Sequence, residues 1–248
     1  MSGHNRWSKI KHAKAASDAK KSKGWTKLLK EVAMAAKSGG DPDGNPRLRT
    51  AIDKARAANM PNDTIERAIK KGSGDLEGVS YEEIVYEAYG PGGVAMMIEV
   101  LTDNRTRTVA EVRNVLQKHH GNLGASGSVA HIFKKKGTIL VEKAAIAEDK
   151  LMELALEAGA DDVRDAGEVW EVETEPAAYL GVKDALGKAK VAIAHGEVGL
   201  IPSTRVALDE DKARSMLKLI AAIEDNDDVQ NVYANHEIED ALLEKISA

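Results

Sequence analysis

The most distinctive chemistry in the sequence comes from cations gathered near the start of the chain. Residues 1–37 hold 10 Lys and Arg against 2 Asp and Glu, although the whole chain of 248 residues has a formal net charge of −5. Four lysines are spaced so that one helix would present them as a stripe: Lys20, Lys23, Lys27 and Lys30. Ammonium groups on flexible stems suit sequence-independent contact with phosphates. We therefore expect a nucleic-acid interface formed by this stripe with Arg6, Trp7, Lys9, Lys11, Lys14 and Lys21.

The stripe requires a helix that continues through Gly24, and it would lie opposite an apolar face that includes Trp25, Leu28 and Val32. The alternative is a solvated helix face, which is the usual role of a run of charges. Trp7 could stack on a base or anchor the segment to the protein, and both remain open. Trp25 has core spacing, so we expect it to be buried.

Two further segments place a pair of arginines at an expected helix start. Asn45-Pro46 precedes Arg47 and Arg49, and Asp103-Asn104 precedes Arg105 and Arg107. Free N–H groups at a helix N-terminus, together with guanidinium groups, suit an anion such as phosphate. The alternative is that the arginines pair with acidic residues of the protein. We carry both pairs as candidate nucleic-acid contacts.

Other kinds of site find no support. The chain has no cysteine and lacks the G-x-S-x-G, H-E-x-x-H, GK[ST] and G-x-G-x-x-G motifs. The segment GNLGASGS (121–128) could form an anion nest, but a flexible connection is favoured. Residues 225–228 resemble a turn and lack the spacing of a calcium loop. We expect no catalytic residues, no metal, no cofactor and no small-molecule substrate, so the protein is not expected to be an enzyme.

Helical periodicity dominates the first part of the chain. A helix is expected from Trp25 to Gly39-Gly40, and a second from Pro46 with Asn45 as its cap. Asp63 and Glu66 have capping-box spacing for a third helix that ends at Gly72. Residues 1–76 are therefore predicted to form a basic helical domain.

The pattern then changes to strands. Segments 85–89 and 96–100 predict a hairpin, followed by a helix over 105–120 and a strand over 129–133. Strands at 138–142, 162–165, 169–174 and 191–199, with helices at 148–158 and 177–188, give the ferredoxin-like order βαββαβ. Glutamates of 168–175 alternate and are expected on a wet face. The tail predicts a strand at 204–208, a helix at 209–225, a strand at 229–233 and a helix at 238–246.

These elements predict an α+β protein of three domains. The N-terminal helical domain precedes two α/β domains, of which one is ferredoxin-like and inserted into the other. The inserted domain covers 136–204, and the host domain covers 77–135 and 205–248. The chain shows no apolar run long enough to cross a bilayer and no secretory signal, and it has no cysteine. We expect a cytoplasmic protein with no membrane partner.

Several stretches closely resemble the YebC/PmpR family. They are GHNRWSKIKHAKAASDAKK, SGGDPDGNPRLRTAIDKARAANMP, YEAYGPGGVAMMIE, TDNRTRTVAEVR, GNLGASGSVAHIF and IPSTR. Asn5-Arg6 stands where Ser-Lys is usual in that family, and Trp25 stands where Phe is usual. The resemblance implies a non-enzymatic factor in gene expression with a helical N-terminal domain and two α/β domains. Residues 136–204 match least.

The resemblance leaves two targets open. Family members are described as probable DNA-binding transcriptional regulators, and also as ribosome-associated factors that help translation through difficult stretches such as proline runs. Mitochondrial relatives are translational activators of cytochrome c oxidase. We expect a nucleic-acid-binding regulator of gene expression, with duplex DNA as the first target and ribosomal RNA or tRNA on the ribosome as the alternative. A protein-interaction module without nucleic acid is a more distant alternative.

Overall fold

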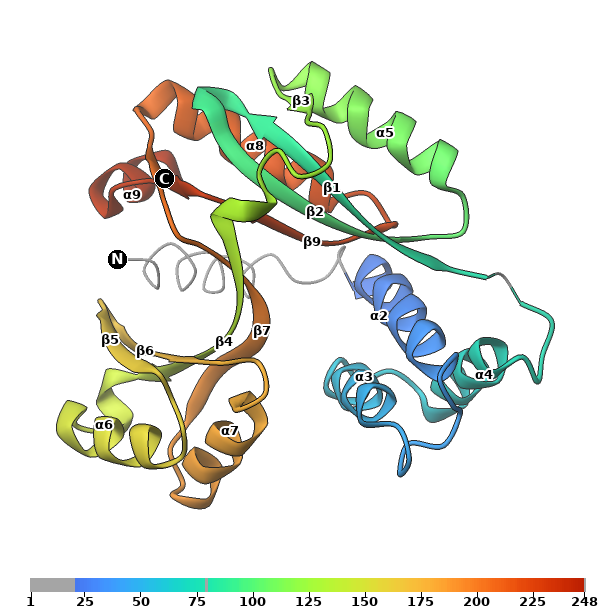
Figure 1. Ribbon diagram of the computed structural model, residues 1–248, viewed down its shortest axis with the longest axis horizontal. Helices are drawn as coiled ribbons and strands as arrows, with labels where there is room; N and C mark the ends of the chain where they lie inside the picture. Colours follow the sequence, from blue (N-terminus) through green and yellow to red (C-terminus); the bar gives the residue numbers. More distant parts are fainter. Residues whose placement is uncertain (1–20, 79, 248) are drawn as a thin grey trace. The chain divides into compact units, whose positions relative to one another are not determined.

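The computed structural model describes residues 21–78 and 80–247 (Figure 1). The chain divides into two compact units. The first, here called the helix–sheet unit, contains residues 21–128 and 215–232. The second, called the ferredoxin-like unit, contains residues 129–214 and 233–247. Each is described by itself.

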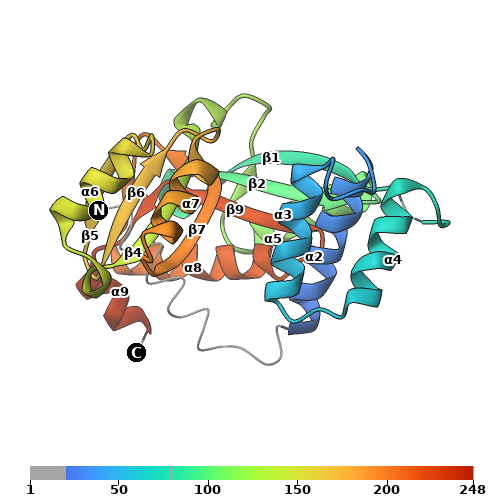
Figure 2. The same ribbon diagram turned by 90° about the horizontal axis from the view of Figure 1, so that it is seen from below.

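The helix–sheet unit begins with three packed helices, α2 (Lys21–Ala36), α3 (Pro46–Ala57) and α4 (Asn62–Ser73), which lie side by side in Figures 1 and 2. Their apolar faces meet in one cluster that includes Val32, Leu48 and Ile65. The helix continues through Gly24. Trp25 packs against this cluster, and its Nε1 donates to the Ala58 carbonyl oxygen at 3.1 Å. Trp25 is thus half-buried at the edge of the core, so the expected contact with the core is present but full burial is not.

The ends of these helices confirm one prediction and correct two. Asn45 caps α3 by accepting a hydrogen bond from Leu48 N. The capping box at Asp63 is wrong, because α4 starts one residue earlier with Pro61 at the cap position and no side-chain cap. Gly72 does not end α4, since the helix runs on to Ser73 and Gly74 adopts the left-handed conformation with φ of 89°. A Cβ on Gly72 would lie 2.1 Å from the Ala33 carbonyl oxygen, so this glycine permits the close approach of α2 and α4.

A mixed group of strands and helices completes the helix–sheet unit. Strands β1 (Glu82–Gly90) and β2 (Val94–Thr102) form the predicted antiparallel hairpin around the 3-10 turn Pro91–Gly93. The sheet order is β3-β1-β2-β9, with β3 at Asn122–Leu123 and β9 at Val229–Ala234. Helices α5 (Arg105–Lys118) and α8 (Glu210–Glu224) supply the buried Leu116 and Leu219. Strand β9, from the C-terminal part of the chain, thus joins a sheet whose other strands come from residues 82–123.

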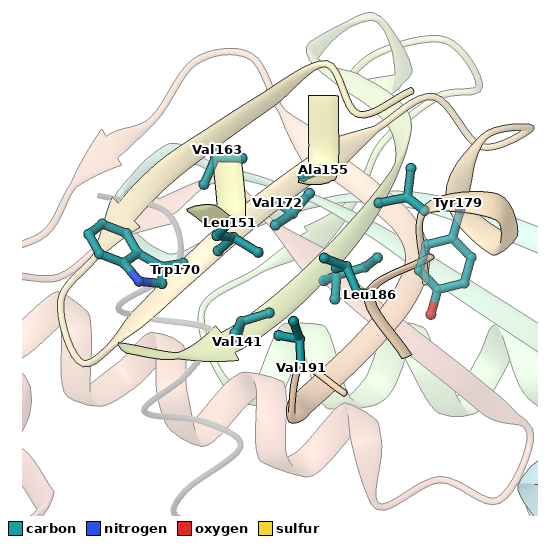
Figure 3. Packing of buried hydrophobic residues seen from close by; sticks show 11 residues of the cluster. Val141, Leu151, Ala155, Val163, Trp170, Val172, Tyr179, Leu186 and Val191 are labelled. Atoms are coloured by element: carbon teal, nitrogen blue, oxygen red, sulfur yellow. The ribbon is translucent and has the colours of Figure 1, made fainter. Parts of the chain in front are cut away.

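The ferredoxin-like unit shows the predicted βαββαβ order. The elements are β4 (Phe133–Glu142), α6 (Glu148–Glu157), β5 (Asp162–Ala166), β6 (Val169–Thr174), α7 (Tyr179–Lys188) and β7 (Ile193–Pro202). The strands lie in the order β5-β6-β4-β7, and all three pairings are antiparallel. Figure 1 shows α6 and α7 on the same side of this sheet. Figure 3 shows their Leu151 and Leu186 packed with Val141 and Val172 of the strands.

Two expectations fail in this unit. Residues 129–133 are not a strand, because Ala130–Ile132 form a 3-10 helix that leads into β4 at Phe133. The face of β6 that carries the alternating glutamates was expected to be exposed to solvent, and it is not. Glu171 is only 2% exposed and lies between Leu140 and Arg164 of the neighbouring strands.

Short elements complete the described chain: a 3-10 turn at Lys143–Ala145, the parallel pair β8 (Val206–Ala207) and β10 (His236–Glu237), and helix α9 (Asp240–Ser247). Across the described ranges, every helix is too short or too polar to span a membrane. The fold is mixed α+β, with N-terminal helices and antiparallel sheets.

Candidate nucleic-acid interface

Part of the expected interface lies outside the described residues. Arg6, Trp7, Lys9, Lys11, Lys14 and Lys20 all precede residue 21. Lys21 and Lys23 lie in the first turn of α2. The structure therefore bears on the lysine stripe only at Lys27 and Lys30.

Lys27 and Lys30 do not face solvent as a free cationic stripe. Lys27 Nζ donates to the Glu224 carbonyl oxygen at the end of α8 at 2.7 Å. Lys30 is only 9% exposed, and its Nζ lies 2.5 Å from Asp228 Oδ1 and 3.0 Å from the Asp227 carbonyl oxygen. The expectation of an outward stripe is wrong at Lys30, which is buried, whereas Lys27 lies at an exposed site and donates to a carbonyl oxygen at a helix end. The acceptors belong to the end of α8 and to the turn before β9.

Asp228 is the centre of this polar cluster. Its side chain is 5% exposed, and besides Lys30 it accepts hydrogen bonds from Thr108 Oγ1 at 2.6 Å, Arg107 at 2.8 Å and Thr102 Oγ1 at 3.1 Å. Burial of the carboxyl group raises its pKa, but the hydrogen bonds from Lys30, Thr108 and Arg107 outweigh burial and hold the pKa well below its usual range. The carboxylate is therefore charged at neutral pH.

A polar cavity of about 360 Å³ borders this cluster. It is lined by Lys30 and Arg107 together with Tyr81, Asp103, Glu111, Asn226, Asp227, Asp228 and Thr26. Both cations already contact Asp228, so the cavity offers no surplus positive charge to a phosphate.

In each of the two arginine pairs, one arginine forms an ion pair within the protein. Arg47 forms an ion pair with Glu83, and Arg107 pairs with Asp103 at 2.7 Å as well as with Asp228. Asn104 caps α5 by accepting from Arg107 N at 3.0 Å. Hydrogen bonds to Asp228 and Asp103 raise the pKa of Arg107. For Arg47 and Arg107 the structure thus shows the intramolecular alternative.

Arg49 and Arg105 keep their side chains at the surface. Both residues are exposed, and neither forms an ion pair with another of the described residues. Arg49 projects from α3, one residue beyond the buried Leu48, and Arg105 opens α5. These two remain candidate phosphate contacts.

Sequence reasoning missed further exposed cations on α3 and α4. Arg56 lies seven residues after Arg49 and so on the same side of α3, while Lys70 and Lys71 lie in the last turn of α4. Within the described ranges none of these three has an ion pair, and all are exposed. At about 100° per residue, Lys70 and Lys71 lie far around α4 from the buried Ile65, and this spacing was the signal that could have found them. Arg56 lies only about 40° from the buried Ile52, so the same spacing gives it a weaker signal. Arg49, Arg56, Lys70 and Lys71 are called the helical cation set below.

The glycine-rich segment 121–128 is held in place and is not a loose connection, which corrects the favoured interpretation. Gly127 N donates to Glu87 Oε1 at 2.6 Å, and Gly124 N donates to the Glu87 carbonyl oxygen at 2.8 Å. Tyr89 Oη donates to the Ser128 carbonyl oxygen at 3.2 Å. The chain's own carboxylate thus takes an N–H group that an external anion would need.

Among residues 21–78 and 80–247, no group of three or more His, Asp or Glu side chains is placed to hold a metal ion. The polar clusters described above consist of ion pairs and capping hydrogen bonds. These ion pairs and hydrogen bonds hold the described elements together, and the remaining candidates are exposed cations.

Comparison with known proteins places the chain in a family. The model of the TACO1/YebC N-terminal domain matches residues 5–75, and the model of the TACO1/YebC second and third domain matches residues 81–236. A probable transcriptional regulatory protein of Geobacter sulfurreducens is 59% identical over 99% of this chain and all of its own length. A protein with the same description in Koribacter versatilis is 52% identical over the full length of both.

A solved structure agrees with these matches. The crystal structure of a conserved hypothetical protein from Aquifex aeolicus superposes with a TM-score of 0.80 at 48% identity, covering 90% of this chain and 93% of that one. The family models together account for most of the sequence, and the relatives align end to end. The chain therefore belongs to the TACO1/YebC family.

Proposed function

We propose that the protein is a nucleic-acid-binding regulator of gene expression and acts without catalysis. The observation that carries this proposal is the helical cation set. Arg49, Arg56, Lys70 and Lys71 present four positive charges on α3 and α4, and none of them forms an ion pair with a carboxylate of residues 21–78 or 80–247. The relatives' description as probable transcriptional regulatory proteins supports regulation as the role.

The proposed contact is with phosphate groups and not with base edges. Lysine and arginine side chains bind phosphates whatever the sequence, and each contact releases counterions, so binding falls steeply as salt rises. Arg105, at the start of α5, is a further candidate contact. Lys27, Lys30, Arg47 and Arg107 are not assigned this role, because their charged groups bind acceptors within the protein.

Duplex DNA is the first target, because the relatives carry the name of transcriptional regulators. Ribosomal RNA or tRNA on the ribosome is the alternative, and it is favoured by the composition of the interface. A recognition helix reads base edges with a compact set of Asn, Gln and Arg side chains. The exposed cations of α3 and α4 are arginines and lysines that do not form such a set. We place this activity in the cytoplasm.

A side-by-side titration tests the proposal. The purified full-length protein is titrated against random duplex DNA and against 70S ribosomes at near-physiological salt. Saturable binding to DNA alone supports a transcriptional regulator, and saturable binding to ribosomes with weak DNA binding supports a translation factor. Binding to neither contradicts the proposal and moves a protein-interaction role to first place.

A further inference from the structure

Two lysines of helix α2 and one in the turn just after it contact segments next to the sheet. Lys27 contacts the last residue of α8, Lys30 contacts the turn between α8 and β9, and Lys37 contacts Ser80 and Tyr81 ahead of β1. All of these residues belong to the helix–sheet unit. Lys27 and Lys30 of α2, and Lys37 just after it, therefore link the helical segment to the segments that flank the sheet.

The Lys30 attachment differs from the other two because it is a buried ion pair. Lys27 and Lys37 donate to backbone or hydroxyl oxygens at exposed sites. The side chains of Lys30 and Asp228 are 11% and 5% exposed. A buried ion pair is strongly disrupted when one partner is lost, because the remaining charge stays away from water.

Asp228 also joins three separate elements. Lys30 comes from α2, Thr102 ends β2, and Arg107 and Thr108 belong to the first turn of α5. The backbone contributes as well, since Leu101 N donates to the Asp228 carbonyl oxygen at 2.7 Å. The carboxylate is thus held by Arg107 and two threonines, and among the described residues Lys30 is its one side-chain partner from α2.

We propose that Asp228 is an electrostatic latch: through Lys30 it fixes the orientation of the helical segment, residues 21–75, on the sheet of β1, β2 and β9. With the latch closed, the helices and the sheet move as one body. With the latch open, the segment stays folded around its own apolar core and changes its orientation. The latch sets a conformation of the protein and does not depend on which ligand the protein binds.

Lys30→Met is the variant that tests the latch most cleanly. It removes the link to α2 and leaves Asp228 with Arg107, Thr102 and Thr108, so the sheet keeps its charge partner. Lys54→Met is the matched control, since it breaks the exposed pair of Lys54 with Glu31 on the neighbouring helix. Lys30→Arg restores the charge and is the conservative rescue.

Because the chain has no cysteine, spin labels can be placed at two chosen sites. Asp53→Cys on α3 and Gln117→Cys on α5 are both exposed positions. Pulsed electron paramagnetic resonance then measures the distance between the label on α3, in the helical segment, and the label on α5, next to the sheet. We expect one narrow distribution for the parent, for Lys54→Met and for Lys30→Arg, and a broad one for Lys30→Met. A Lys30→Met distribution as narrow as the control overturns the latch, and so does a broad distribution in Lys30→Arg.

Hydrogen exchange on the unmodified protein gives a second test that does not depend on any variant folding. The latch predicts that amides of α2 around Lys30 open together with those of β2 and exchange at similar rates. Exchange in α2 that is faster by about tenfold or more than in β2 means that the helix opens independently, and this result overturns the proposal.

Discussion

Lys30 and Arg49 carry the same charge on adjacent helices, yet their surroundings give them different roles. Lys30 is buried against Asp228, while Arg49 is exposed and has no ion pair with the described residues. Phosphate binding requires a cation whose charge is not already compensated. At the scale of the residue, the location of each carboxylate therefore decides which cations are available for the proposed nucleic-acid contact.

Asp228→Asn is expected to destabilise the protein by about 3–5 kcal/mol at neutral pH, because it leaves buried Lys30 without its charge partner. The folded-state pKa of Asp228 lies below the unfolded value, so its stabilising effect is present above the unfolded pKa and is lost as pH falls through the folded pKa. The other charged groups that face it are Arg107, Asp103, Asp227 and Glu111.

The expected stability difference between the parent and Asp228→Asn is therefore constant from about pH 8 to pH 5, and it shrinks only below about pH 4, near the unfolded pKa of aspartate. Urea denaturation at a series of pH values measures it. A difference that already shrinks between pH 7 and pH 6 would contradict the assignment to Asp228.

Gly72→Ala tests the close approach of α2 and α4. The new Cβ would lie 2.1 Å from the Ala33 carbonyl oxygen, so the helices must separate, with an expected loss of about 1–3 kcal/mol. Gly24→Ala is the matched control, because its Cβ has nothing within 4 Å and alanine in a helix gains about 0.5–1 kcal/mol over glycine. In a thermal unfolding experiment, Tm should be lower than that of the parent for Gly72→Ala and higher for Gly24→Ala. Equal Tm values in the two variants would refute the steric account.

At the scale of the element, two asparagine caps of the same type differ in burial. Asn45 caps α3 and also donates from Nδ2 to the carbonyl oxygens of Ala35 and Gly39, both at 2.8 Å. Asn104 caps α5 at an exposed position. Asn45 thus fixes both the start of α3 and the end of α2.

Asn45→Ala should therefore cost more than Asn104→Ala. We expect about 2–3 kcal/mol for Asn45, as the cap energy adds to the cost of unpaired buried carbonyl groups, and about 1 kcal/mol for Asn104. Chemical denaturation of both variants measures the difference. If the two losses are equal, the additional hydrogen bonds of Asn45 do not contribute.

Periodicity predicted most elements because it reports local burial. The faces of α3 and α5, the β1–β2 hairpin and the ferredoxin-like order all follow from apolar spacing and turn residues. The strand expected at 129–133 failed for a local reason. Its alternating residues suit a strand, but Ala130–Ile132 turn in a 3-10 helix before the ladder begins at Phe133.

The candidate site was harder to predict, since its partners are distant in sequence. Lys30 and Asp228 are 198 positions apart, and the segment containing Asp228 resembled only a turn. Helical spacing alone shows Lys27 and Lys30 as a stripe and gives no information about what packs against it. The exposed cations of α3 and α4 were within reach of the same helical arithmetic, because their buried neighbours were correctly identified.

At the scale of the whole molecule, the ends of the ferredoxin-like insertion meet. Phe133 pairs with Pro202 at the start of the β4–β7 ladder, and Ser203 N donates to the Ile132 carbonyl oxygen at 2.8 Å. Adjacent ends are what the proposed insertion into a host domain requires. The insertion itself remains a proposal.

Replacing residues 134–201 by a short glycine linker should then leave the helices and the first sheet folded, because the linker spans a small gap. The shortened protein loses Trp170 and keeps Trp7 and Trp25, so with Trp7 replaced by Phe its tryptophan fluorescence reports Trp25 on the helical core. We expect a cooperative unfolding transition with a native-like Trp25 signal. An unfolded or aggregated product would contradict the insertion.

Charge is distributed unevenly along the chain, and this also matters at the scale of the whole molecule. Residues 1–75 hold 17 Lys and Arg against 8 Asp and Glu, whereas the whole chain has a net charge of −5. A basic end on an acidic body can approach a polyanion while the body stays away from it. The helical cation set is the part of this basic end that the described structure leaves unpaired.

The salt dependence of nucleic-acid binding tests this claim most directly. The parent is compared with a variant in which Arg49, Arg56, Lys70 and Lys71 are all alanine, and with a control that replaces four exposed lysines elsewhere: Lys118, Lys150, Lys183 and Lys188. The logarithm of the binding constant for whichever target binds is plotted against the logarithm of salt concentration. The helical variant should weaken binding and flatten the slope by about 0.7–0.9 for each lost phosphate contact, while the control keeps the parental slope. Equal slopes for the helical variant and the parent would contradict the central claim that these four cations contact nucleic acid.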